Sequence, residues 1–566
     1  MIWIVDAFRN GWRLIRNLLA RLPGPRVDYV VVDLAGSFPE RTPPPQPFWR
    51  RMVVRPWQRQ EESLEALRAR LERIAGAPGV RGIVLRVRDL HVRMATVQSL
   101  RSAIGELRRR GKRVIAYLPE ANLATYYLAT AADEIVMAAA GFWNVTGLRT
   151  EITFFRSALD RIGILPEFDR IAEYKTAADP LMRPGLSEHH REVIESILDG
   201  LVGEVTTDVA SARRLDPAAV RAAIDRAPMT ADEARAAGLI DGISYEDELP
   251  ARLGSPDRPA GLHPWAHASR RLPVSYRWRA RTAVIGVVEL IGNIITGESR
   301  EMPVPLPVIG GRFAGSDTVA RAFRAAERHP GVRAVVFHVE SGGGSALASD
   351  LIWREVDRVR RKKPVVVFMG NVAGSGGYYV ACGANCIVAQ PNTITGSIGV
   401  LNGKLTARGL YERLGLNREI VARGGASTLE SMFQPYTPDQ LARVQHENQM
   451  IYRRFIGTVA AGRSKAESEV DAIARGRVWT GRQALERGLI DELGDFTLAM
   501  RRACELAGIA SAQAVTALTI QPPRAAGIPS AAGAMVEALE TLGAIGALAG
   551  ERALLMTSVP GGVTWD

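Results

Sequence analysis

The chain has 566 residues, of which 47% are hydrophobic and 23% are charged. That length is too great for one hydrophobic core, and the composition excludes a largely disordered protein. The formal net charge of +12 belongs mostly to arginines in helix-like segments such as "EALRARLERIAG". No nucleic-acid-binding motif accompanies these arginines, so we expect attraction to an anionic membrane surface and no nucleic-acid partner.

Residues 1–26 have the spacing of an amphipathic helix, with the apolar side chains on one stripe and the arginines largely elsewhere. The stripe consists of Ile4, Phe8, Trp12, Ile15, Leu19 and Leu22. The segment lacks the roughly 18 uninterrupted apolar residues of a spanning helix, and it has no small-residue cleavage site. We expect a helix that lies at the membrane interface with Trp3 and Trp12 as anchors. The alternative is a helix that packs on this protein or on a neighbouring subunit.

The chain contains an internal repeat with an offset of about 250 residues. "GVRGIVLRVRD" (79–89) matches "GVRAVVFHVES" (331–341), and "MTADEARAAGLIDGI" (229–243) matches "WTGRQALERGLIDEL" (479–493). Each copy alternates Val/Ile-rich runs with helical stretches, which predicts an α/β fold with a mostly parallel sheet flanked by helices. The stretch between the copies is rich in Pro, Gly and Arg and lacks periodicity. We therefore predict two tandem α/β domains, 27–255 and 281–515, joined by a linker over 256–280.

Residues 516–566 form a C-terminal extension. "AAGAMVEALETLGAIGALAGERALLM" (531–556) is small and apolar but carries three glutamates, which argues against a membrane span and predicts a packing or oligomerisation helix. The cysteines form neither a disulfide framework nor a CxxC pair, and Cys382 and Cys386 are expected on one helix as small core residues. The pair His189-His190 lacks the context of a metal site and is expected on a helix surface.

The two copies differ where chemistry is expected. Alignment of the paired tyrosines places Ser375 of "GSGGYY" opposite Leu123, and the run "SGGGS" (341–345) opposite "DLHVR" (89–93). Glycines that directly follow a buried strand let backbone N–H groups approach a bound atom closely, as an oxyanion hole requires. The first copy therefore lacks both the hydroxyl and the glycine-rich loop.

A lysine shows the opposite pattern. Lys175 in "YKTAADPLMR" aligns with Gly425 of the second copy. A serine hydroxyl needs a base, and a lysine serves as one only when it is neutral. Burial that lowers a lysine pKa from about 10.4 to about 7 costs roughly 4–5 kcal/mol. The reciprocal differences predict a Ser-Lys dyad, with the serine from one repeat and the lysine from the other.

These motifs, together with "TGSIGV" (395–400), resemble the long, duplicated form of signal peptide peptidase A, also called protease IV, a family with the ClpP/crotonase fold. The resemblance covers residues 28 to 515. It implies a membrane-associated serine peptidase that degrades signal-peptide remnants and other apolar peptides, assembles as a homotetramer at a bacterial inner membrane, and needs no metal or organic cofactor. The sequence departs from the family pattern at Gly342, which replaces a proline, and in lacking a transmembrane anchor within residues 1–26.

Carried onto matching positions, the resemblance makes Ser375 the nucleophile and Lys175 the general base. Ser397 is a candidate to orient the lysine, the alternative being a hydroxyl that caps a loop. The backbone N–H groups of Gly343 and Gly376 are the expected oxyanion hole, with Gly344 as the alternative to Gly343.

Three other functions are weighed against the peptidase. "AGSGG" nearly fits the nucleophile elbow of an α/β-hydrolase, but about five residues separate it from its strand and no Asp and His partners are evident. A crotonase-type acyl-CoA enzyme would share the fold without the serine and lysine. A catalytically inactive peptidase-like membrane scaffold would not need to keep both Ser375 and Lys175.

Overall fold

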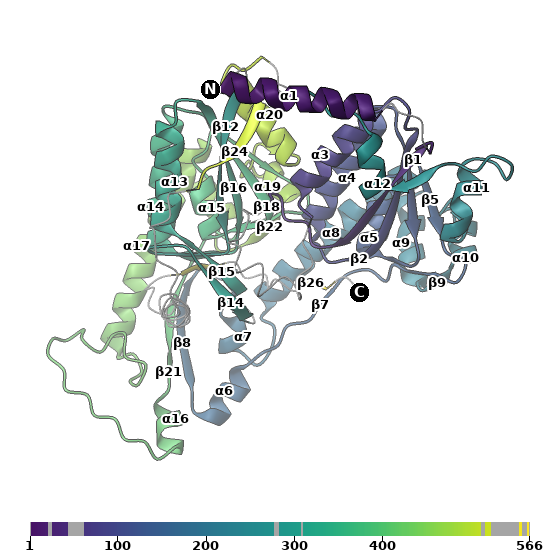
Figure 1. Ribbon diagram of the computed structural model, residues 1–566. Coiled ribbons are helices and arrows are strands. Elements are labelled where there is room, and N and C mark those ends of the chain that lie inside the picture. The colour runs from purple at the N-terminus through teal and green to yellow at the C-terminus, as the bar shows by residue number, and fades with distance from the viewer. Residues whose placement is uncertain are drawn as a thin grey trace. The chain divides into compact units, whose positions relative to one another are not determined.

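The structure is a computed structural model that describes residues 2–20, 25–42, 62–276, 282–306, 310–510, 515–521, 554–556 and 563–564 (Figure 1). The chain divides into two compact units. Unit 1 comprises the described residues of Met1–Arg149, Leu201–Thr282 and Thr564–Asp566, and unit 2 comprises those of Thr150–Gly200 and Ala283–Val563. The boundaries of the units thus differ from those of the repeats, because residues 150–200 of the first repeat belong to unit 2.

Unit 1 is built on a six-stranded parallel sheet with the strand order β10-β5-β3-β2-β1-β11. The strands are β1 (Tyr29–Gly36), β2 (Gly82–Leu90), β3 (Arg113–Leu118), β5 (Glu134–Met137), β10 (Gly242–Ile243) and β11 (Leu262–Pro264). Their near-continuous apolar runs are typical of parallel strands that are covered on both faces. One face packs against α3 (Leu64–Ala75), α4 (Met94–Arg109) and α5 (Leu123–Ala129), and the other against α11 (Leu249–Leu253).

Unit 2 contains a larger sheet with the order β22-β20-β18-β16-β12-β24, in which β19 also pairs with β18 and β23. These strands are β12 (Ala283–Ile291), β16 (Val332–Ser341), β18 (Val365–Gly374), β19 (Cys386–Ala389), β20 (Ile394–Gly396), β22 (Val478–Thr480), β23 (Glu492–Leu493) and β24 (Val515–Thr519). One face packs against α13 (Ser316–Arg328), α14 (Ala346–Arg360), α15 (Gly376–Ala381) and α17 (Pro438–Arg463), and the other against α20 (Phe496–Leu506). The expected βαβ architecture is therefore present in each unit.

A second sheet of unit 2 brings distant segments together, with the order β14-β15-β13-β17-β25-β21-β8. Its strands are β8 (Leu165–Ile171), β13 (Asn293–Ile295), β14 (Arg300–Leu306), β15 (Gly310–Gly315), β17 (Gly343–Ser345), β21 (Val400–Thr406) and β25 (Leu554–Met556). β8 and β21 pair antiparallel along their whole length, from Val400 opposite Ile171 to Thr406 opposite Leu165. This ladder is the physical reason that residues 150–200 belong to unit 2.

The N-terminal helix is present as α1 (Ile2–Leu19). Within the described parts of the chain, no helix combines the length and the apolar character needed to cross a membrane. Most of the helix expected over 531–556 lies outside the described residues. At its end the prediction is wrong, because Leu554–Met556 form strand β25, where the backbone pairs with strands on both sides.

Two smaller predictions about side chains also need correction. Cys382 and Cys386 are both buried, as core residues should be, but they do not share a helix. Helix α15 ends at Ala381, and Cys386 begins strand β19. His190 lies in α8 (Glu188–Arg213) but not on its surface, because its side chain is only 1% exposed.

Candidate active site

Ser375 sits at the junction between strand β18 and helix α15, in the position of a helix N-cap. Its φ is 54° and its ψ is −114°, a left-handed backbone conformation that non-glycine residues rarely adopt and that must be held by the surroundings. The Ser375 N–H donates to the Gly396 carbonyl at 2.7 Å. A serine at an N-cap usually accepts a hydrogen bond from the helix backbone, but the Ser375 hydroxyl makes no such bond. The hydroxyl is therefore free for another partner.

Two threonines hold the end of β18 in place. Thr395 Oγ1 donates to the Ala373 carbonyl and Thr393 Oγ1 donates to the Gly370 carbonyl, both at 2.7 Å. Both threonines are fully buried. These hydrogen bonds tie the end of β18 to the segment of residues 393–395, and so they help to hold the strained turn at Ser375.

The glycine-rich turn of β17 packs directly on the start of α15. A Cβ added to Gly376 would lie 2.6 Å from Ser349 Oγ, 3.2 Å from the Gly343 Cα and 3.3 Å from the Gly344 N. Gly343 and Gly344 have φ values of 106° and 152°, which side chains with a Cβ strongly disfavour. These three positions therefore require glycine, and they bring the backbone of residues 343–344 close to the residue after Ser375.

The two glycines that could supply the second N–H group differ in their surroundings. The Gly343 N–H donates to Ser341 Oγ at 3.1 Å. Gly344 lies between two neighbouring strands, opposite Ile294 on one side and Leu555 on the other. The Gly343 N–H therefore has a side-chain acceptor, whereas Gly344 belongs to the ladder between β13 and β25.

Lys175 reaches Ser375 from a segment 200 positions earlier in the chain. Its Nζ lies 2.6 Å from Ser375 Oγ, 3.1 Å from Ser397 Oγ and 2.9 Å from the Ser397 carbonyl oxygen. The side chains of Lys175, Ser375 and Ser397 are all 0% exposed. The structure thus brings together the three side chains that the sequence singled out.

The environment of Lys175 disfavours its charged form. Burial holds the pKa of Lys175 well below its ordinary value, because an ammonium loses its hydration in such a site. Neither of the hydrogen-bonding partners, Ser375 and Ser397, carries a charge to compensate for this loss. A neutral amine next to a serine hydroxyl can accept the hydroxyl proton.

Close backbone packing fixes the segment that carries Lys175. A Cβ added to Gly476, whose φ is 84°, would lie 2.4 Å from the Lys175 N. The Tyr174 N–H donates to the Arg475 carbonyl at 3.2 Å. Because β8 ends at Ile171, four residues after the strand suffice to deliver the lysine to the site.

A buried charged group that the sequence reasoning missed supports this segment. Asp179 is 2% exposed, and its carboxylate accepts hydrogen bonds from Arg170 Nη1 and Ser187 Oγ, each at 2.6 Å. His190 Nδ1 lies 3.9 Å from the same carboxylate. Burial lowers the pKa of His190 in spite of this carboxylate. The sequence signal was an aspartate four residues after Lys175 within the apolar stretch "TAADPLM".

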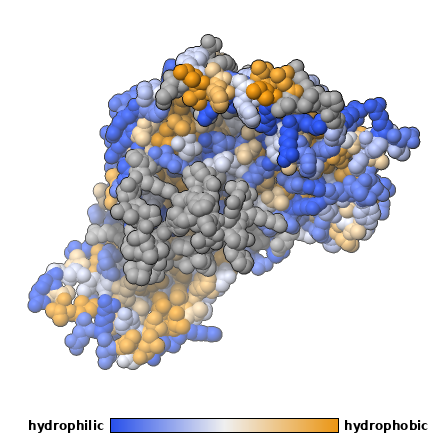
Figure 2. Space-filling model, in the orientation of Figure 1, coloured by the Kyte–Doolittle hydropathy of each residue, from blue (hydrophilic) through white to orange (hydrophobic). Residues whose placement is uncertain are grey.

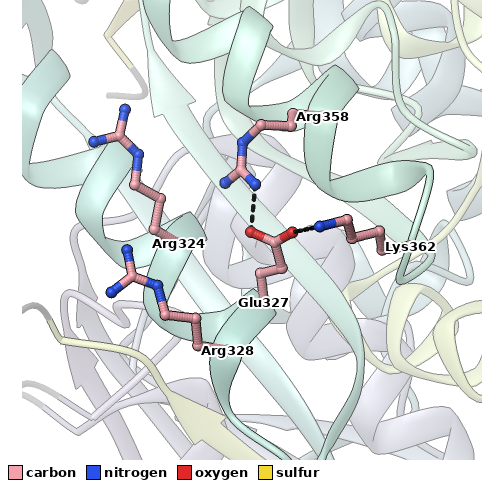
Figure 3. Close-up of a pocket in the computed structure, with 5 residues that line it drawn as sticks. All are labelled: Arg324, Glu327, Arg328, Arg358 and Lys362. Carbon is pink, nitrogen blue, oxygen red and sulfur yellow. Dashed lines mark hydrogen bonds and ion pairs between the residues drawn. The ribbon is translucent and has the colours of Figure 1, made fainter.

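A surface pocket elsewhere in unit 2 contains none of these residues. It lies between α13 and α14 and is lined by Arg324, Glu327, Arg328, Arg358 and Lys362 (Figure 3). Glu327 forms ion pairs with Arg358 and with Lys362, the latter at 2.7 Å. Ion pairs at the protein surface typically contribute little to stability, and the five lining side chains include no serine or cysteine.

Comparison with known proteins connects this arrangement to a family. The sequence profile of "Peptidase family S49" matches residues 106–256 and 357–510. "Serine protease SPPA, chloroplastic" of Arabidopsis thaliana is 31% identical over 475 residues, which cover 81% of this chain and 68% of the relative. "Protease 4" of Haemophilus influenzae is 31% identical over 448 residues, covering 76% and 70%. "Protease 4" of Salmonella typhi is 30% identical over 459 residues, covering 79% and 72%.

The family profile matches once in each repeat, which confirms the predicted internal duplication, and the sheets of the two units confirm the predicted α/β fold class. The relatives that extend over most of the chain are named as proteases, so the acyl-CoA enzyme and the inactive scaffold are no longer needed as explanations. The chain belongs to peptidase family S49, in its long duplicated form, and is a serine peptidase.

Proposed function

We propose that this serine peptidase hydrolyses peptide bonds through an acyl-enzyme, with Ser375 as the nucleophile and Lys175 as the general base. One observation carries the proposal: a lysine and a serine, both fully buried, lie 2.6 Å apart, and no carboxylate in the described part of the chain bonds to the lysine. The lowered pKa of Lys175 supports a neutral amine, which is the form that can act as a base.

In the proposed reaction the Ser375 O–H donates its proton to Lys175 Nζ as the oxygen attacks the substrate carbonyl. The ammonium that forms then gives the proton to the departing amine, which leaves an acyl ester on Ser375. In the second half, Lys175 takes a proton from water, the hydroxide attacks the ester, and Ser375 leaves with the proton. Each half of the reaction therefore returns Lys175 to its neutral form.

Two backbone N–H groups would stabilise the negative oxygen of the tetrahedral intermediates. Gly376 and Gly344 are the proposed donors, because a Cβ added to Gly376 would lie only 3.3 Å from the Gly344 N, which places the two backbones close together at the start of α15. The Gly343 N–H becomes an equivalent donor only when it leaves Ser341 Oγ. Ser397 would orient Lys175 through its hydroxyl and its carbonyl. Donors of this kind typically contribute about 10²–10³-fold to kcat each.

The proposed substrates are signal-peptide remnants and other apolar peptides at a membrane surface, and α1 supports this location. Asp6 and Asn10 are buried, whereas Ile4, Phe8 and Trp12 are 73%, 80% and 66% exposed. Figure 2 shows hydrophobic atoms exposed along the upper rim, where Figure 1 places α1. Such an outward apolar stripe on a basic chain fits binding at the interface of an anionic membrane. Cosedimentation of the protein with anionic phospholipid vesicles tests this location.

We also propose a homotetramer at the bacterial inner membrane. The segment between α16 (Arg408–Arg413) and α17 supports an assembly, because it is extended and largely exposed (Figure 1). It carries the apolar side chains Leu414, Leu416, Val421 and Met432, which are 51% to 86% exposed. Exposed apolar residues that gather in one segment are typical of a subunit contact. Light scattering of the purified protein measures the subunit number.

The Ser-Lys assignment is tested by hydrolysis of an unstructured apolar peptide. We expect Ser375→Ala and Lys175→Ala each to lower turnover by about 10³-fold or more, because either change removes a member of one catalytic unit. The thermal unfolding transition should remain in both variants. Appreciable turnover in either variant would contradict the assigned role.

Lys112 provides the matched control, because it is a second lysine with a buried ammonium. Its Nζ donates to the carbonyls of Ala77 and Val80 at 2.6 and 2.7 Å. Lys112→Ala should therefore lose stability, by about 1–3 kcal/mol, and keep its turnover.

A further inference from the structure

Strand β25 from the C-terminal extension lies directly against the glycine-rich turn. It pairs antiparallel with β17, so that Met556 lies opposite Gly343, Leu555 opposite Gly344 and Leu554 opposite Ser345. On its other side Leu554 pairs with Leu401 of β21. β25 is thus inserted between the strand that carries the oxyanion-hole glycines and the strand that anchors the lysine segment.

The same strand contacts Ser397, the residue that bonds to Lys175. Ser397 Oγ donates to the Met556 carbonyl at 3.4 Å, and Ser397 Oγ also accepts from Lys175 Nζ. Helix α15, which begins directly after Ser375, lies beside β25. The backbone of residues 554–556 therefore occupies the place next to Ser375, Lys175 and Ser397.

An extended chain that adds itself to an open strand edge is a recurring way of binding peptides, because backbone hydrogen bonds provide affinity without demanding a sequence. The segment Leu554-Leu555-Met556 has the apolar character that we propose for substrates. With this segment in place, Ser375, Lys175 and Ser397 have no exposed surface.

We propose that residues 554–556 are an intramolecular pseudosubstrate, which holds the peptidase inactive by occupying its peptide-binding edge. This inference rests on the proposed role of Ser375 and Lys175. A segment tethered to its own site acts at an effective concentration on the order of millimolar. A competing apolar peptide must therefore be abundant, or the tail must bind elsewhere, before turnover begins.

The full-length variant Leu555→Pro tests the proposal. Proline has no N–H and is excluded from a strand that is paired on both sides. We expect kcat/KM for an apolar peptide to rise by about tenfold or more while kcat stays unchanged. The rise equals one plus the effective concentration of the tail divided by its dissociation constant, so a tail at about 1 mM that binds with a dissociation constant of about 0.1 mM gives this factor. Leu555→Val is the matched control, because it keeps the backbone pairing and should keep the low kcat/KM. The peptide of residues 551–559, added to Leu555→Pro, should restore the inhibition competitively.

Hydrogen exchange provides a measurement that does not depend on activity. In a Ser375→Ala background, the amides of residues 343–345 should exchange slowly with the native tail and faster when Leu555→Pro is added. Equal exchange, together with equal kcat/KM in the active background, would overturn the inference. If no variant with an intact Ser375 hydrolyses peptides, the proposed function fails, and the exchange measurement still decides whether the strand occupies the site.

One further outcome would also overturn the inference. Intact-mass measurement should find the tail complete in the wild type. Loss of the C-terminal residues from the wild type but not from Ser375→Ala would mean that the strand is a substrate of the site and does not block it.

Discussion

The two repeats share a scaffold but differ in chemistry. Tyr126 in the first repeat donates its hydroxyl proton to the Leu239 carbonyl at 2.8 Å, and Tyr378 in the second donates to the Leu489 carbonyl at the same distance. In both repeats an arginine also donates two hydrogen bonds to an aspartate. The same aspartate accepts a hydrogen bond from a backbone N–H of the strand that follows the tyrosine-bearing helix, which is Ile135 in the first repeat and Ile387 in the second. These pairs are Arg213 with Asp241 and Arg463 with Asp491.

The difference is concentrated where the strand turns into the helix. In unit 1, Asn122 and Thr125 form a capping box at the start of α5, and Leu123 is buried in the apolar core. In unit 2 the aligned Ser375 has a left-handed φ and its hydroxyl bonds to Lys175. The same strand-to-helix junction can therefore carry a stabilising helix cap, as in the first repeat, or a serine with a strained backbone that presents its hydroxyl, as in the second. The buried tyrosine and the ion pair around the junction are the same in both repeats.

The largest expected effect comes from an attempt to move the nucleophile between the repeats. The double variant Leu123→Ser with Ser375→Ala should remain as inactive as Ser375→Ala alone, about 10³-fold or more below the wild type. Among the described residues of unit 1, Lys112 is not at this place, because it precedes β3 whereas Leu123 follows it, and its Nζ bonds to the carbonyls of Ala77 and Val80. Steady-state hydrolysis measures the outcome. Activity restored by the double variant would show that the repeats differ by one hydroxyl only.

The next effect concerns the glycine turn. Gly344→Ala should lower kcat by about 10²–10³-fold, since one oxyanion donor would be displaced. The added Cβ would lie 2.1 Å from the Ile294 carbonyl oxygen, which is backbone and cannot rotate away. In the first repeat, which lacks the glycine-rich turn, the position aligned with Gly344 is Val92. Steady-state assays measure the fall in kcat, and thermal unfolding measures any loss of stability that the clash causes.

Gly297→Ala is the control for backbone strain alone. Gly297 has a φ of 81°, but nothing lies within 4 Å of an added Cβ. This variant should lose about 1–3 kcal/mol of stability and keep kcat. If Gly297→Ala lowers kcat as much as Gly344→Ala does, strain alone explains the loss and the oxyanion assignment is wrong.

The sequence predicted the repeated architecture because the same pattern of apolar strands occurs in both copies. It also predicted that Ser375 and Lys175 are partners, because the first repeat lacks the serine and the second repeat lacks the lysine. It could not predict that Lys175 folds with the second repeat, since the β8–β21 ladder joins segments more than 200 residues apart. Strand β25 was missed for a similar reason: "ALLM" is short and apolar, and only its neighbours in space make it a strand.

The buried Asp179 offers a smaller test of the lysine segment. Asp179→Asn keeps the shape of the side chain but weakens the bonds from Arg170 and Ser187. We expect kcat to fall by about tenfold, because the loop would hold Lys175 less accurately, with little change in KM. Asp179→Glu keeps the carboxylate, but its kcat should still lie below the wild-type kcat, because the longer side chain displaces Arg170 and Ser187.

Asp241→Asn in unit 1 is the matched control for Asp179→Asn. Asp241 also accepts hydrogen bonds from an arginine, Arg213, and from the Ile135 N–H. Its loss should lower the unfolding temperature without changing kcat. If both aspartate variants change kcat equally, Asp179 acts through general stability and not through the position of Lys175.

The smallest expected effect is that of Ser397→Ala. The change removes one of the two acceptors that Ser397 offers to Lys175 Nζ, but the Ser397 carbonyl, at 2.9 Å, remains. One neutral hydrogen bond contributes about 0.5–1.5 kcal/mol, so kcat/KM on the high-pH plateau should fall by about two- to tenfold.

The pH profile of Ser397→Ala gives the sharper test. Burial lowers the pKa of Lys175, and only the neutral amine can take the Ser375 proton, so kcat/KM of the wild type should fall as pH drops through that lowered pKa. An acceptor stabilises the ammonium more than the amine, so removing Ser397 Oγ lowers the pKa further. The acid limb of Ser397→Ala should therefore move to lower pH. A shift to higher pH, or a loss above 100-fold, would mean that Ser397 does more than orient the lysine, because neither follows from removal of one neutral acceptor.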